Sequence, residues 1–529
     1  ILAQGPERTV CVLVACAAGH DSWWMSTPHM DEPGSAGCGP FNSLQSPSAR
    51  TVGDTSIDPD ILFGTSIWKV LARPQLWRAS PCDITSDRDW HRTLAVKCSK
   101  LDSFVSHSWQ ESCWQKHLTL LIHFGWLSAA AVACTLLVVL VVLDACSLLP
   151  TMQVQESDSW HSSYSVSPWS DIPPLVGLLV LFLMPLVRGG LGGSGMVFFD
   201  QVCINQRDTE LKARGVNSLA GFLFNSHSMT ALASHNYTQR LWCMFELAFF
   251  LALDNGARPI VWCPILLYCL GFTQYVLALI AHGILTMQIV MDAGDFSALY
   301  VAIVGLGIVP AFALVHNLRS YMRDRGGMLR DLRNYDICNA QCRLDEDRDF
   351  IKRSIVHWCG SEEQFNELVR TDVAAKVQAV MACLDASYTK VFITCFPAAT
   401  FSIEWMVAIA RSGLPPQELL VMELRVATRL FLTYPACMRL VYILAGIFKA
   451  RWRRRFVDLA FSCTLTVVWI MLVFISMTAG VHMGANLLPT VLYAVGCAIV
   501  TCLLFSRWSL RIPGQQLVPP ESAATSVAV

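Results

Sequence analysis

Long apolar runs are the feature of this sequence that most restricts its fold. A helix of about 20 apolar residues crosses the hydrocarbon core of a bilayer, which is about 30 Å thick. Of the 529 residues, 54% are hydrophobic and only 15% are charged, which is too apolar for a typical water-soluble chain. Apolar runs occupy residues 125–149, 172–187, 265–291, 299–315, 391–410, 431–448, 456–479 and 487–505. The sequence therefore predicts an α-helical polytopic bundle of about eight transmembrane helices, with the lipid bilayer as its partner.

The distribution of basic residues predicts how the chain crosses the bilayer. Cytosolic segments next to spans are enriched in Lys and Arg. Residues 148–171 contain neither, whereas residues 449–455 (KARWRRR) and 507–511 are basic. We therefore expect residues 148–171 outside and residues 317–389, the soluble domain and both termini in the cytosol; the sequence does not say which membrane. The net charge of −1, with no basic–aromatic motif, excludes nucleic acid as a partner.

A stretch after the second apolar run alternates between patterns typical of strands and of helices. Residues 196–200 (MVFFD) form a short apolar run closed by an acid, as in a buried parallel strand. Residues 210–225 have helical spacing, residues 229–233 suit a second strand, and residues 240–253 suit a helix with an apolar face. This order predicts a doubly wound α/β layer, which binds ligands beyond the carboxyl ends of its strands. Residues 260–264 (IVWCP) fit either a further strand or the start of a span.

Three motifs within and upstream of this stretch are specific. They are FVSHSW at residues 104–109, FFDQVCINQRD at 198–208 and RLWCMFEL at 240–247. Together they resemble the Toll/interleukin-receptor (TIR) domain, in which a first strand ends in a small polar run, a second strand ends in Asp and the third helix opens with WCxxEL. The middle motif also resembles the core of the fungal heterokaryon-incompatibility (HET) domain, a relative of TIR. The resemblance implies a TIR- and flavodoxin-like fold, a signalling role and a homo-oligomer formed through this domain.

The resemblance also implies roles for individual residues. In many TIR domains the glutamate of WCxxE cleaves NAD, which makes Glu246 the candidate catalytic residue of an NAD glycohydrolase, with NAD as substrate and no cofactor. A fixed carboxylate can stabilise the positive charge that develops on the ribose as the C–N bond breaks. The alternative is that Glu246 only caps its helix or pairs with Arg240. Arg240, Trp242 and Cys243 are expected to be structural parts of the motif, with Trp242 as a packing residue.

Polar side chains near the expected strand ends are the candidate ligand-binding set, namely Ser106, Asp200, Asn205 and Gln206. In a doubly wound sheet such residues line the ligand cleft. The last three fit a turn equally well, because Asn and Asp side chains bond to nearby backbone groups.

The cysteines do not predict a metal site or a disulfide framework. There are 21 of them, and no two are spaced as CxxC. His357 and Cys359 follow Cys338 and Cys342, but their spacings are poor for metal ligands. We therefore expect no metal and mostly reduced thiols.

These signals divide the chain into six parts. They are a partly disordered N-terminal region at 1–100, a TIR/HET-like α/β domain at 101–260 with an inserted membrane hairpin at 125–188, a membrane hairpin at 261–317, a cytosolic helical segment at 318–390, membrane helices at 391–511 and a disordered tail at 512–529. The leading expectation is a multi-pass membrane protein that signals through the TIR-like domain, either by cleaving NAD or as an assembly module. The alternative is a channel or transporter with a non-catalytic, regulatory TIR-like domain.

Overall fold

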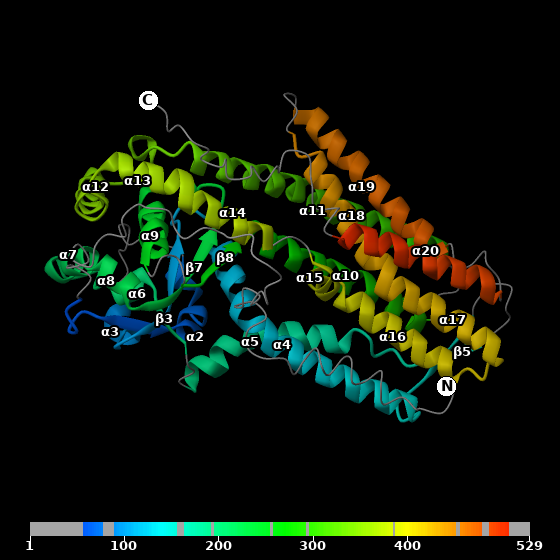
Figure 1. The fold of residues 1–529 in the computed structure, drawn as a ribbon. Helices are drawn as coiled ribbons and strands as arrows, with labels where there is room; N and C mark the ends of the chain where they lie inside the picture. The colour runs from blue at the N-terminus through cyan, green and yellow to red at the C-terminus, as the bar shows by residue number, and fades with distance from the viewer. Residues whose placement is uncertain are drawn as a thin grey trace, which may run out of the picture. The chain divides into compact units, whose positions relative to one another are not determined.

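The structure is a computed structural model of the chain (Figure 1). It describes residues 57–77, 89–155, 163–191, 195–253, 258–291, 296–383, 387–450, 455–478 and 486–506. The predictions for residues 1–56, for most of the basic segment 449–455, for 507–511 and for the tail lie outside the described residues. The chain divides into two units. Among the described residues, the first holds those within 57–142, 172–273 and 324–385, and the second holds those within 143–171, 274–323 and 386–506.

The first unit is built on a six-stranded sheet with the order β2-β1-β6-β3-β7-β8. Its strands are β1 (Phe63–Ser66), β2 (Val96–Lys97), β3 (Leu101–His107), β6 (Met196–Phe198), β7 (Ser226–Ala233) and β8 (Ile260–Pro264). The neighbours β6, β3, β7 and β8 are parallel. Counted along the chain, these four strands have the order 2-1-3-4, which begins the flavodoxin-like doubly wound order. The strands expected near residues 104, 196 and 229 are present, and residues 260–264 are a strand.

Two strands lie upstream of residue 101, where the sequence placed the start of the α/β domain. β1 runs antiparallel to β6, with Thr65 opposite Val197, and β2 runs antiparallel to β1. Three short helical elements accompany them, namely α2 (Ile67–Leu71), η1 (Pro74–Trp77) and α3 (Trp90–Leu94). β1 has the sequence FGTS, which lacks the alternation of apolar residues that marks a strand. The sheet therefore begins earlier than predicted, because pairing with β6 and not local pattern defines this strand.

Helices cover both faces of the sheet, as its parallel strands require. Phe198 and Ala231 point into one hydrophobic core, and their sequence neighbours Val197 and Leu232 point into the other. The first core is formed with α7 (Thr209–Asn217), α8 (Leu219–Phe224), α9 (Leu241–Ala252), α12 (Asp345–Cys359), α13 (Glu362–Leu368), η6 (Val369–Val373) and α14 (Ala374–Cys383). The expected helices at 210–225 and 240–253 are thus present, the former as the pair α7 and α8.

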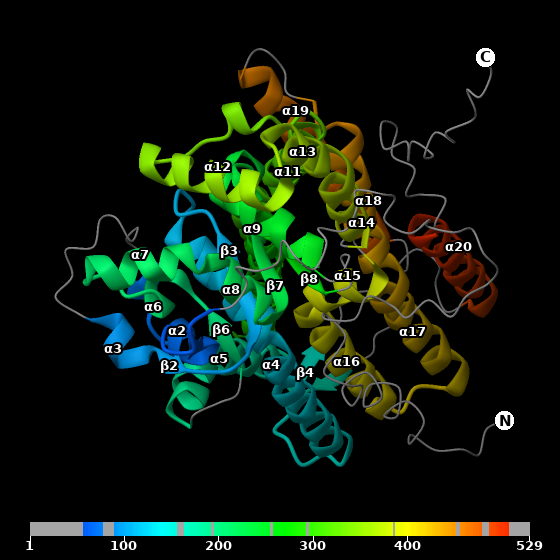
Figure 2. The ribbon, with the colours of Figure 1, turned by 60° about the vertical axis from the view of Figure 1, so that its left-hand side comes forward.

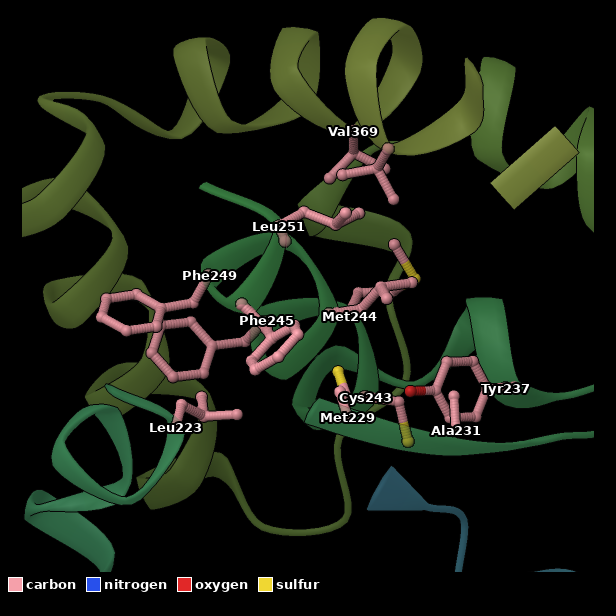
Figure 3. Close-up of a cluster of buried hydrophobic side chains, with 14 of the residues drawn as sticks. Leu223, Met229, Ala231, Tyr237, Cys243, Met244, Phe245, Phe249, Leu251 and Val369 are labelled. Atoms are coloured by element: carbon pink, nitrogen blue, oxygen red, sulfur yellow. The ribbon is translucent and has the colours of Figure 1, made fainter. Parts of the chain in front are cut away.

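The helix α9 is buried on all sides. Figures 1 and 2 show it between the sheet and the helices α12 to α14. In Figure 3 its residues Phe245 and Phe249 point toward Leu223 of α8, while Leu251 approaches Val369. The rings of Phe249 and Trp358 of α12 lie 5.0 Å apart. A helix that is apolar all round needs such a covering, so the helical segment predicted at 318–390 packs onto the α/β domain and completes its core.

A long insertion separates β3 from β6 in the sequence. It contains α4 (Cys113–Ala145) and α5 (Ile172–Gly190), which correspond to the expected hairpin. α4 begins before residue 125, because Leu120 and Leu121 in its first turns pack under the sheet. The insertion leaves β3 and β6 paired side by side, with Ser103 opposite Val197.

The second unit is largely helical. Its elements include α10 (Ile265–Met291), α11 (Phe296–Arg333), α15 (Tyr388–Thr394), α16 (Phe396–Arg411), α17 (Pro416–Thr428), η7 (Arg429–Thr433), α18 (Tyr434–Ile447), α19 (Arg455–Thr478), α20 (Leu487–Phe505) and the strands β4 (Met152–Gln155) and β5 (Ser163–Val166). α10 and α11 each continue beyond this unit.

Six helices in the described residues are long and apolar enough to cross a membrane. They are Cys113–Ala145, Ile172–Gly190, Ile265–Ile284, Pro416–Ile447, Arg455–Val473 and Leu487–Phe505. α15 and α16 together form a seventh only if a pair bent by 75° is counted as one span. The expected span at 299–315 lies inside α11, where the side chains of residues 296–307 lie outside the described ones. The chain therefore has the make-up of an integral membrane protein with an α/β domain, and eight spans are not confirmed.

Candidate functional site

The polar residues singled out in the sequence gather at the carboxyl edge of the sheet. β3 lies between β6 and β7. The chain passes from the carboxyl end of β3 to β6 on one side, and it later forms β7 on the other side. The register pairs Ser106 with Ala231 and His107 with Leu232, which places the ends of β3 and β7 side by side. This is the switch point at which doubly wound sheets bind their ligands.

The centre of the site is a hydrogen-bonded group of three side chains. The Ser106 hydroxyl donates to Oε2 of Glu246 at 2.5 Å and lies 2.7 Å from the hydroxyl of Tyr237. Ser106 is the penultimate residue of β3, Tyr237 opens η3 (Tyr237–Gln239), and Glu246 is on the second turn of α9. The backbone N–H of Leu241 donates to the carbonyl of Gln341 at 3.0 Å, which fixes the start of α9. The structure thus joins two predicted site residues that are 140 positions apart.

Burial controls the protonation of this group. Withdrawal from water raises the pKa of Glu246 to about 8, the Ser106 hydrogen bond opposes that rise, and the negative charge of Asp200 adds to it. Burial likewise raises the pKa of Tyr237 well above its usual value. At neutral pH both groups are therefore mainly protonated, and Glu246 gains its negative charge only as the pH approaches 8.

Asp200 forms a second polar centre at the same edge. It lies two residues beyond the end of β6, where it opens α6 (Asp200–Cys203) and does not itself belong to the strand. Its carboxylate accepts from the indole N–H of Trp109 at 2.9 Å and from the backbone N–H of Gln201 at 2.7 Å. Burial raises the pKa of Asp200 to about 6, against these hydrogen bonds and the charge of Lys116.

Lys116 closes the site from the side of α4. It is fully buried, and its ammonium group donates to the carbonyl of Ser108 at 3.1 Å. The same group lies 4.7 Å from the centre of the Trp109 ring, within the range of a cation–π contact. The positive charge of Lys116 therefore acts on the carboxylate of Asp200.

Asn205 and Gln206 bond to nearby backbone groups. The side-chain oxygen of Asn205 accepts from the backbone N–H groups of Arg207 and Asp208, at 2.9 and 3.1 Å, which is the turn alternative. The Gln206 amide donates to the backbone carbonyl of Asp200 at 3.2 Å. Asn205 is thus used by its own loop, whereas Gln206 supports the position of Asp200.

The remaining motif residues have structural contacts. The Trp242 indole lies 6.0 Å from the ring of Phe350 and donates to Asp347 at 3.1 Å, so it joins α9 to α12. Cys243 is buried in the first core, and Arg240 precedes α9 with its backbone bridged to Gln341. In the part of the chain that the structure describes, no ion pair joins Arg240 to Glu246, and the carboxyl of Glu246 accepts from the Ser106 hydroxyl.

Trp242→Ala should lower the free energy of unfolding by about 3 kcal/mol, because it removes a large ring from the α9–α12 contact. Trp242→Phe keeps part of that contact and should cost less. Melting of the full-length protein can be followed with a thiol-reactive dye, since Cys203, Cys243 and Cys263 are buried until unfolding. An unchanged melting temperature in Trp242→Ala would rule out the packing role.

Three residues of the site were not predicted, namely Trp109, Lys116 and Tyr237. Trp109 ends the FVSHSW motif and Tyr237 lies just before RLWCMFEL, so their positions beside the motifs were the available signal. Lys116 had none, because a single lysine at the start of a helix usually faces solvent.

A shallow depression elsewhere on the sheet does not belong to this site. It has a volume of about 520 Å³ and is lined by residues that include Leu62, Cys98, Phe224 and Asn225. Cys98 and Asn225 precede β3 and β7, so the depression lies at the amino ends of the parallel strands. Ligands of doubly wound sheets bind at the opposite edge. Within the described ranges no three His, Cys, Asp or Glu side chains come together in a way that could hold a metal ion.

The fold and the site define a class: an integral membrane protein that carries a parallel-centred α/β domain with a buried acidic cluster at its carboxyl edge. Searches of protein-family models, of curated proteins and of solved structures give no match to this chain.

Proposed function

We propose that this chain is a multi-pass membrane protein whose TIR-like domain signals by cleaving NAD at the bond between nicotinamide and ribose. The observation that carries the proposal is the 2.5 Å hydrogen bond between Ser106 and Glu246 at the switch point. These residues come from two separate motifs of the TIR resemblance. The 2-1-3-4 order of the parallel strands supports the proposal, because that resemblance implies a flavodoxin-like sheet.

The chemistry assigned to the site needs a fixed negative charge. As the C–N bond breaks, its electron pair leaves with nicotinamide and positive charge develops on the ribose. The ionised carboxylate of Glu246 stabilises that charge, while Ser106 and Tyr237 hold its position. Water then adds to the ribose carbon and loses a proton, so no cofactor is consumed. Asp200, held by the indole N–H of Trp109, lies at the same edge of the sheet.

The test is direct. Full-length protein purified in detergent is incubated with NAD, and free nicotinamide is measured. We expect release that depends on protein concentration and requires Glu246. A correctly folded protein that releases no nicotinamide would leave the TIR-like domain as an assembly module, which would then act through a homo-oligomer.

One observation favours the second function, a channel or transporter with a non-catalytic regulatory domain. α15 and α16 form a pair of apolar helices bent by 75°. Discontinuous helices of this kind often form the ion or substrate sites of transporters. Ion flux in reconstituted vesicles without nicotinamide release would support this function over the enzymatic one.

We further propose eight spans, with the TIR-like domain and both termini in the cytosol. Labelling should therefore place residues 148–171 and 317–389 on opposite sides of the membrane, because the first segment has no basic residue and the second has many. Cys146 and Cys338 are both exposed and can report these sides in a background without other cysteines. Labelling of both from one side would mean that residues 299–315 do not cross, since only two spans would then separate the segments.

A further inference from the structure

A group of buried polar side chains lies within the second unit, far along the chain from the motifs. Its centre is Glu404 of α16, whose side chain is fully buried. Oε2 of Glu404 accepts from the backbone N–H groups of Trp169 and Ser170, at 2.8 and 2.7 Å. Oε2 therefore connects the segment after β5 to α16, whereas Oε1 makes no hydrogen bond to the described residues.

Asp171 brings a second acid to the same place. Its charge interacts with the carboxylate of Glu404, and its own carboxyl faces Thr286 and His282 of α10. Oδ2 of Asp171 lies against the backbone of α10, 3.7 Å from the point that a Cβ on Gly283 would occupy. Three stretches of chain thus meet here: the segment before α5, α10 and α16.

Four oxygens of this group make no hydrogen bond to the described residues. They are Oε1 of Glu404, Oδ1 of Asp171, and the hydroxyls of Ser170 and Thr286. The Ser170 hydroxyl faces Glu404 and the Thr286 hydroxyl faces Asp171, but neither contact has hydrogen-bond geometry. Ser170 is fully buried and Thr286 is 9% exposed. Buried polar atoms are rarely left unsatisfied, because removing them from water without a new partner destabilises the fold.

Asp144, a buried acid of the same unit, has its charge neutralised by a side chain of the protein. Asp144 forms a 2.8 Å ion pair with Arg411 and accepts from Ser167 and from the Trp169 indole, at 2.7 and 2.8 Å. Among the described residues neither Glu404 nor Asp171 has such an ion pair. When both are ionised, the buried carboxylate of Glu404 and the half-buried carboxylate of Asp171 repel each other. His282 is the titratable side chain that faces Asp171, and a bound cation would relieve the repulsion between the two acids.

The helix geometry points in the same direction. Glu404 lies on α16, the second helix of the pair that is bent by 75° at residue 395. Breaks of this kind in apolar helices are tolerated where they line a polar cavity or an ion site. An acid on the broken element is a functional residue by default.

We propose that Glu404, Asp171, Ser170 and Thr286 form a binding site for a monovalent cation of the size of Na⁺. The four free atoms are carboxylate and hydroxyl oxygens, the ligands that hard cations prefer. The absence of a three-membered His, Cys, Asp or Glu cluster from the described residues argues against a transition metal. This site is independent of the NAD chemistry, and it would be present whether or not the α/β domain is an enzyme.

The experiment compares thermal melting of the full-length protein in NaCl and in choline chloride at equal ionic strength. A ligand that binds only the folded state stabilises it, so Na⁺ should raise the melting temperature in a saturable way. Glu404→Gln keeps an acceptor for the two backbone N–H groups and should abolish the Na⁺ effect. Ser170→Ala removes one hydroxyl ligand, and it should raise the Na⁺ concentration at half effect by about tenfold. It should not lower the melting temperature in choline.

Glu418→Gln is the matched control, since Glu418 lies in the first turn of α17 and is partly exposed. It should keep the full Na⁺ effect. Equal melting of the wild type in sodium, lithium, potassium and choline chlorides would overturn the proposal. So would a Na⁺ effect that persists in both Glu404→Gln and Ser170→Ala. Stabilisation on acidification alone, with no difference between Na⁺ and choline, would replace the cation by a proton.

Discussion

Replacing Glu246 with glutamine should reduce NAD cleavage by about 100-fold or more and leave the protein folded. Glutamine has the same shape as glutamate, and its side-chain oxygen can still accept from the Ser106 hydroxyl. The protonated carboxyl present at neutral pH is itself uncharged, so the folded state loses little. What the variant cannot supply is the negative charge that stabilises the transition state.

The pH profile of the wild type tests the same assignment. Because burial raises the pKa of Glu246 to about 8, the catalytically useful carboxylate is scarce at pH 6 and abundant at pH 9. Cleavage by the wild type should therefore rise with pH, reach half its maximum near pH 8 and level off above about pH 9. The residual activity of Glu246→Gln should lack this rise. Free nicotinamide, measured from pH 6 to pH 9.5, reports both.

Glu210→Gln is the control for this experiment. Glu210 is exposed in the first turn of α7, so its substitution should change neither the rate nor the pH profile. Wild-type rates in Glu246→Gln would contradict the enzymatic assignment. If Glu246→Gln loses activity but the wild-type rate does not change with pH, the role given to the ionised carboxylate is contradicted.

The sequence named Ser106 and Glu246 as separate candidates, and their hydrogen bond is seen only in the folded chain. Ser106 and Glu246 are far apart in the chain, but the rules for parallel sheets place the end of β3 beside the helix that follows β7. Tyr237 was missed because it lies in a three-residue element with no periodic pattern. Lys116 was missed because only the folded chain shows that this lysine is fully buried.

The limits of the membrane prediction have a similar cause. The sequence divided the chain between an apolar run at 299–315 and a polar helical segment from 318, yet α11 runs through both without a break to Arg333. Arginine and methionine favour helices almost as well as alanine does. Charged residues after position 315 therefore end the apolar run but do not end the helix. In the same way the apolar run at 391–410 gave no sign of the bend between α15 and α16, because the bend changes direction and not composition.

Arg319→Met should lower the free energy of unfolding by about 3–5 kcal/mol, the usual cost of breaking a buried ion pair from one side. Arg319 lies on α11 and is fully buried, and it forms a 2.9 Å ion pair with Asp458 of α19, whose side chain is 8% exposed. Its guanidinium also donates to the backbone carbonyls of Phe448 and Ala450, at 2.8 and 3.1 Å. One side chain therefore satisfies the end of α18, the connection that follows it and the acid of α19. Methionine fills the space but leaves an unpaired buried acid and two carbonyls without donors.

The companion variants separate charge from geometry. Arg319→Lys keeps the charge but cannot reach several acceptors at once, so most of the loss should remain. Arg323→Met removes a neighbouring arginine that donates to the Lys449 carbonyl at 3.3 Å and to Ser320. Its charge affects Asp458 less than that of Arg319 does, so this variant should cost less than Arg319→Met. Melting of the full-length protein, followed through its buried thiols, measures all three. Full stability in Arg319→Lys would mean that charge alone suffices, whereas equal losses in the Arg319 and Arg323 variants would mean that this ion pair has no special part in joining α11, α18 and α19.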